Sequence, residues 1–165
     1  MLFHISEDPG IVEFIPRPSK YTRDPVVWAV DAARLRNYLV PRDCPRVAYY
    51  AGSETTDADR ERFLGSSAAV LAVEAKWWPR IRSCRLYSYR LPSDTFELMD
   101  QDAGYFVSRD SVRPLEVEVI DDPITALLVR QVELRVLPEL GSLRAAVVAS
   151  SLRFSIIRMA NAAGT

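Results

Sequence analysis

The chain contains few residues of the types that build metal sites or disulfide frameworks. Among its 165 residues there is one histidine, His4, and there are two cysteines, Cys44 and Cys84. A zinc site or a disulfide framework needs more ligands, so we expect no metal site and two reduced thiols, as in a cytoplasmic protein. No stretch of 18 uncharged apolar residues is present, and no basic segment precedes a long apolar one. We therefore expect neither a membrane span nor a signal peptide.

The chain also lacks an excess of charge of either sign. Its formal net charge is −1, which predicts no general attraction to nucleic acid or to an anionic membrane. Hydrophobic residues make up 48% and charged residues 26%, as in ordinary globular proteins. The length fits one domain over residues 1–165.

Short alternating or β-branched segments separated by turns predict many strands. These lie at 1–5, 26–30, 46–50, 68–75, 84–91, 95–99, 103–108, 114–120 and 133–138. Helices are expected at 32–39, 55–65 and 124–132, with Asp31, Thr56 and Asp122 as N-caps, and 140–151 is either a helix or a mixed segment. Because strands dominate the middle without regular alternation with helices, we expect an α+β domain. Its sheet should be mixed but largely antiparallel, with flanking helices.

His4 lies within the apolar segment MLFHIS and has two possible roles. Its neighbours Phe3 and Ile5 should point to the opposite side of the strand. The ring either forms the wall of a pocket or packs in the core with its hydrogen bonds satisfied. Ser6 shares its side, and together the two side chains offer two hydrogen bonds to one sugar or phosphate.

The segment PRDCPRV forms a polar turn between prolines. One interpretation is an anion clamp, in which Arg42 or Arg46 binds a phosphate or carboxylate and Asp43 positions the guanidinium. The other is a local network of arginine and aspartate that holds the turn. Cys44 would be a nucleophile only if the fold brought His4 close to it.

Glu116 and Glu118 alternate with apolar residues in PLEVEVI. They form either the solvated face of a half-buried strand or a cleft in which one carboxylate acts as a general base or stabilises positive charge.

The segments LFHISEDPGIVEFIPRPS, VVWAVD, YLVPRDCPRV and FSIIRMANA together resemble a small bacterial family of uncharacterised proteins. The resemblance covers nearly the whole chain, and PRDCPR is its most specific part. It implies no activity.

The first strand with its His-x-Ser pair, the proline-rich loop and the strand VVWAVD also resemble the ADP-ribosyltransferase-like superfamily. That resemblance implies a transferase fold with NAD as cofactor. His4 would hold a ribose of NAD, Trp28 or a neighbouring tyrosine would stack on nicotinamide, and Glu116 or Glu118 would stabilise the oxocarbenium-like transition state. The chain departs from the pattern in having no tyrosine at the expected stacking position.

Three classes of function follow from these features. An NAD- or nucleotide-related transferase requires His4, an arginine of PRDCPR and Glu116 or Glu118 in one cleft. A non-catalytic module for a nucleotide or sugar phosphate requires arginines there without a positioned carboxylate, with Ser6, Trp28, Arg42 and Arg46 as ligand-binding residues. A structural or interaction protein would have no pocket, with His4 packed and hydrogen-bonded to the backbone.

Overall fold

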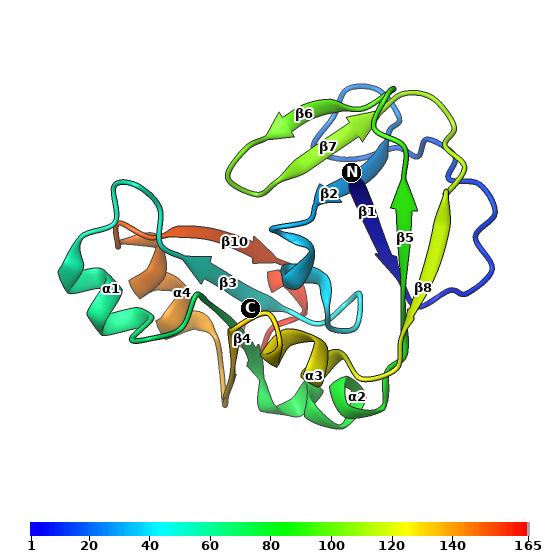
Figure 1. Ribbon diagram of the computed structural model, residues 1–165. Helices are drawn as coiled ribbons and strands as arrows, with labels where there is room; N and C mark the ends of the chain where they lie inside the picture. Colours follow the sequence, from blue (N-terminus) through cyan, green and yellow to red (C-terminus); the bar gives the residue numbers. More distant parts are fainter. Residues whose placement is uncertain (165) are drawn as a thin grey trace. The chain divides into compact units, whose positions relative to one another are not determined.

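The computed structural model describes residues 1–164 and is shown in Figure 1. The chain forms two compact units, each assembled from two separate segments. The first unit comprises Met1–Tyr38 and Arg85–Asp121, and the second comprises Leu39–Cys84 and the chain from Asp122 onward.

The first unit is built on a six-stranded sheet in which every neighbouring pair is antiparallel. The strand order is β6-β7-β2-β1-β5-β8, so β6 and β8 are its edges (Figure 1). The strands are β1 (Leu2–Ser6), β2 (Val27–Asp31), β5 (Leu86–Leu91), β6 (Glu97–Asp100), β7 (Tyr105–Ser108) and β8 (Glu116–Ile120).

The core of the first unit lies against one face of this sheet, where the proline-rich segment between β1 and β2 is fastened. Phe14 packs there and exchanges backbone hydrogen bonds of 2.8 and 2.9 Å with Val112. The hydroxyl of Tyr89 donates to the carbonyl of Asp8 at 2.6 Å and accepts from the amide of Ile11 at 3.1 Å. A segment without regular structure is thus held by specific contacts to the sheet.

The second unit is built on a four-stranded sheet in the order β10-β3-β4-β9. Only β4 and β9 pair in parallel. Its strands are β3 (Arg46–Tyr50), β4 (Ala69–Glu74), β9 (Val132–Leu137) and β10 (Arg153–Ile157). Its helices are α1 (Asp57–Phe63), α2 (Trp78–Ser83), α3 (Pro123–Leu128) and α4 (Gly141–Val148), with 3₁₀ turns η2 (Ala75–Trp77) and η3 (Met159–Asn161). Both central strands are buried along their whole length, as expected for strands covered on two faces.

Two of the three predicted helix caps are confirmed. Thr56 accepts a hydrogen bond from the amide of Asp59 at the start of α1, and Asp122 accepts one from the amide of Thr125 at the start of α3. The helix predicted at 32–39 is wrong. Asp31 does accept a bond from the amide of Arg34 at 2.7 Å, but only the 3₁₀ turn η1 (Leu35–Tyr38) follows. Pro41 disfavours a helical conformation at the residue before it, so the turn has no room to extend.

The α+β class and the largely antiparallel pairing are confirmed, but the strands form two sheets where one was expected. The expectation of one domain over residues 1–165 stays a prediction. Within residues 1–164, no helix combines the length and the apolar character that crossing a membrane requires.

Candidate binding pocket

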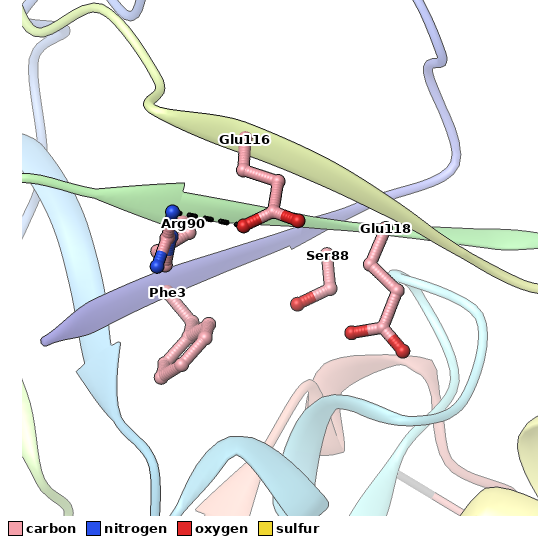
Figure 2. Close-up of a pocket in the computed structure, with 5 residues that line it drawn as sticks. All are labelled: Phe3, Ser88, Arg90, Glu116 and Glu118. Carbon is pink, nitrogen blue, oxygen red and sulfur yellow. Dashed lines mark ion pairs between the residues drawn. The ribbon is translucent and has the colours of Figure 1, made fainter.

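A small pocket opens on the first unit beside the last three strands of its sheet. Its volume is about 90 Å³, and β1, β5 and β8 line it with Phe3, Ser88, Arg90, Glu116 and Glu118 (Figure 2). Polar and aromatic side chains thus converge on one small hollow from three strands that lie far apart in the sequence.

Strand register explains why these five side chains meet. Arg90 of β5 lies directly opposite Phe3 of β1 and Glu116 of β8. Two residues along β5, Ser88 lies opposite Glu118. Directly paired residues, and residues two apart on one strand, point to the same face of a sheet. The pocket is therefore a direct product of the antiparallel pairing.

The charges in the pocket are partly neutralised within it. The Nη2 atom of Arg90 lies 2.9 Å from Oε2 of Glu116, the ion pair marked in Figure 2. Among the described residues Glu118 forms no such ion pair. Two carboxylates against one guanidinium leave a net charge of −1, and the uncompensated carboxylate is that of Glu118.

His4 lies on the other face of the sheet. Its register partner on β5 is Tyr89, one residue away from both Ser88 and Arg90. Its ring packs 4.8 Å from the ring of Phe14, and its Nδ1 donates a hydrogen bond of 2.9 Å to the carbonyl of Trp28. The cleft that was to hold His4 together with Glu116 or Glu118 is not formed, because the sheet itself lies between them.

The two other residues predicted in the first unit lie away from the pocket. Ser6 accepts a hydrogen bond of 3.0 Å from the amide of Asp8 and so closes the turn after β1. Trp28 shares the face of the pocket, because Val30, two residues further along β2, pairs with Phe3. However, β1 and β5 separate its strand from β8, a distance of about 14 Å at ordinary strand spacing. Trp28 packs instead against Tyr105, with ring centroids 5.5 Å apart.

Arg42 and Arg46 belong to the second unit, where Arg42 lies in the turn before β3 and Arg46 is the first residue of β3. The guanidinium of Arg46 is buried, with 2% of the residue exposed. Its Nη1 donates to the carbonyls of Pro41, Arg42 and Cys44 at 3.2, 3.4 and 2.9 Å. Arg46 thus holds the PRDCPR turn together through backbone carbonyls, where the sequence suggested either an anion clamp or a network with Asp43.

Cys44 lies in the same turn and is fully buried. Burial raises the pKa of its thiol to about 12, and the nearby Arg46 offsets this only in part. The thiolate, which is the nucleophilic form, is therefore scarce at neutral pH. Within residues 1–164, no three histidine, cysteine, aspartate or glutamate side chains are grouped so that they could hold a metal ion.

The sequence interpretation named Glu116 and Glu118 as candidates but omitted Phe3, Ser88 and Arg90. The available signal was in CRLYSYRL. Ser88 and Arg90 fall on one side of the expected strand, and Tyr87, Tyr89 and Leu91 fall on the other. That alternation predicts a shared face, but it does not tell which strands flank it.

Comparison with known proteins identifies the family. Residues 3–162 match the model of a family described as "Family of unknown function (DUF6886)". The match covers nearly the whole chain, so the chain belongs to this family, and the predicted membership in a family without an assigned activity is confirmed. Searches of the curated proteins and of the solved structures returned no match.

Proposed function

We propose that this member of DUF6886 is a non-catalytic binding module whose pocket takes a single cationic group, an alkylammonium or a guanidinium. The observation that carries the proposal is the carboxylate of Glu118, which has no ion-pair partner among the described residues and lies beside an Arg90–Glu116 pair that is already neutralised. A cation that enters the pocket is attracted by this uncompensated carboxylate.

The composition of the pocket also favours such a group. Phe3 contributes an aromatic wall, and the face of its ring suits the methylene stem of a lysine or arginine or the cation itself. Ser88 adds a hydroxyl that accepts a hydrogen bond from an N–H donor. A phosphate would instead meet a net negative charge.

The volume limits the ligand to one functional group. Pockets for whole small molecules usually measure about 300–1,000 Å³, whereas this one measures about 90 Å³. A nucleotide or NAD therefore exceeds it. The nucleotide-related transferase, its NAD cofactor and the ADP-ribosyltransferase likeness stay predictions with less support, since His4 and the glutamates lie on opposite faces.

A cytoplasmic location is part of the proposal. Its support is that Cys44 and Cys84 are both buried thiols outside any disulfide, which is the ordinary state of cysteines in a reducing compartment.

The test is an NMR titration of the full chain with agmatine, which carries both an ammonium and a guanidinium, against the neutral and similarly sized hexanol. Because only one cationic group of agmatine enters this open pocket, we expect a dissociation constant on the order of 1 mM. Chemical-shift changes should be confined to β1, β5 and β8. The same titration with NAD and ADP-ribose tests the transferase prediction.

Variants make the titration specific. Glu118→Gln keeps the shape of the side chain and removes its charge, so it should abolish the agmatine shifts. Glu61→Gln, the same change on the exposed surface of α1, should leave them intact. His4→Ala should lose stability without losing agmatine binding. The proposal fails if Glu118→Gln binds agmatine like the wild type, or if NAD but not agmatine shifts these strands.

A further inference from the structure

We propose that β8 binds an extended basic peptide by strand addition, with one lysine or arginine of that peptide entering the pocket. The inference rests on the proposed function of the pocket and names the partner that would deliver the cation. It concerns the outer edge of β8, which is a different feature from the pocket itself.

The outer edge of β8 is open and regular. β8 pairs with β5 through five consecutive residue pairs without a register shift, and it is the last strand of its sheet in the part of the chain that the structure describes. Leu115, Val117 and Val119 are 61%, 42% and 50% exposed. An exposed edge with free backbone donors and acceptors is a template for another strand.

The opposite edge of the same sheet has protections that β8 lacks. β6 contains a register irregularity between Leu98 and Asp100, and irregularities of this kind interrupt strand pairing. Its first residue, Glu97, is held by Arg109 at 3.0 Å. The sequence of β8, EVEVI, contains no proline, lysine or bulge, and its only charged residues are acidic, so it excludes an acidic strand but not a basic one.

The two faces of β8 determine the chemistry of the occupant. Glu116 and Glu118 point to the pocket side, whereas Val117 and Val119 point to the other. Directly opposite residues of paired strands interact, and opposite charges and β-branched pairs are the favourable combinations. The matching strand therefore alternates a lysine or arginine with a β-branched apolar residue.

The same argument disfavours a second copy of this chain. In the two-fold antiparallel pairings of β8 with itself that are centred on Glu118 or on Val117, Glu118 lies opposite Glu118 or Glu116 lies opposite Glu118. Like charges directly opposite each other destabilise a strand pair. A basic strand can pair with this edge without repulsion between like charges, whereas a second β8 cannot.

The experiment uses the full chain and a capped peptide of about eight alternating lysine and valine residues. Binding is followed by NMR, with amide hydrogen exchange of β8 as the readout. We expect slowed exchange of those β8 amides that face away from β5. A glutamate–valine peptide should not bind. A lysine–valine peptide that is N-methylated at every second residue should bind about tenfold more weakly, because it lacks the backbone N–H groups that would donate hydrogen bonds to β8.

Two edge variants serve as a matched pair. Val117→Lys introduces a lysine on the apolar face of β8 and should abolish peptide binding. Leu98→Lys makes the same change of charge on the β6 edge, where the residue is also exposed, and should leave binding intact. Agmatine titrations of both variants report on the pocket alone.

The outcomes separate the two proposals. Peptide binding with protected β8 amides supports strand addition. If agmatine binds but the peptide leaves β8 exchange unchanged, or if the N-methylated peptide binds equally well, strand addition is wrong and the pocket function stands. If neither binds, both are wrong. Dimerisation of the chain through β8, seen by sedimentation, would replace the peptide by a second copy and overturn the choice of occupant.

Discussion

Tyr49 illustrates how a single buried polar atom makes stability depend on pH. The residue lies in the middle of β3 with 0% of its surface exposed, and its ring packs edge-on to Phe63. Its hydroxyl has no hydrogen-bond partner among the described residues. Burial raises the pKa of this phenol from 10.0 to about 12, and the nearby Arg135 lowers it only in part. The folded protein therefore keeps a proton that the unfolded chain releases.

Removing this hydroxyl should flatten the stability curve at alkaline pH. A pKa that is raised on folding contributes stability that is complete below pH 10 and is lost as the pH rises from 10 to about 12. Over that window the wild type should lose roughly 2–3 kcal/mol more than Tyr49→Phe. Near pH 7 the variant should be as stable as the wild type or more stable, because no hydrogen bond is lost. Urea unfolding at pH 8 and pH 11 measures both, with about half of the alkaline loss, roughly 1–1.5 kcal/mol, expected by pH 11. Identical pH dependence in the two proteins would refute the assignment.

His4 shows at the same scale why a residue's role is difficult to infer from its neighbours in sequence. Alternation along β1 correctly separates it from Phe3, which lines the pocket. The identity of the residues that share its own face, Tyr89 and Phe14, depends on strand pairing and on where the irregular segment returns. Those contacts make it a packed residue of the first unit.

At the scale of elements, the turn between β6 and β7 depends on a glycine. Gly104 has φ +65°, and a Cβ there would lie 2.7 Å from Oδ2 of Asp31 and 2.7 Å from Cγ of Arg34. Its carbonyl accepts a hydrogen bond of 3.0 Å from the amide of Asp31 at the end of β2. Close approach and backbone conformation both require the absence of a side chain.

Substitution of Gly104 should therefore lower the free energy of unfolding by more than its left-handed backbone conformation alone explains. Gly104→Ala should destabilise the protein by about 2–4 kcal/mol, from the left-handed conformation and the two contacts together. Gly65→Ala is the matched control, because Gly65 has φ +54° with nothing within 4 Å of an added Cβ. It should cost about 1–2 kcal/mol. Chemical denaturation of both variants measures the difference, and an equal cost would show that Asp31 and Arg34 move aside freely.

At the scale of the whole molecule, both units are discontinuous in sequence. In the second unit the two central strands β3 and β4 come from Leu39–Cys84, whereas the flanking strands β9 and β10 follow Asp122. The first unit is likewise assembled from two segments, which are separated in the sequence by Leu39–Cys84. The first unit is therefore complete only when the chain reaches Asp121, and the second only when β10 has followed.

A fragment of the second unit should accordingly fail to fold. The peptide Leu39–Cys84 contains β3 and β4 but neither of their outer partners, so both strands would expose edges and apolar faces that are buried in the protein. We expect a disordered circular dichroism spectrum and poorly dispersed amide resonances. Native-like dispersion from this fragment would contradict the dependence on β9 and β10.

The sequence by itself determined the positions of most strands and two helix caps, because these follow from local alternation and from side chains that bond to nearby amides. The 46–50 strand and the caps at Thr56 and Asp122 are examples. Only the tertiary structure decided which strands are neighbours. Register joined Glu116 and Glu118 to Arg90 and Phe3, and left His4 on the opposite face. It also separated the strands into two sheets, because pairing depends on residues far apart in the chain, which periodicity along one strand does not encode.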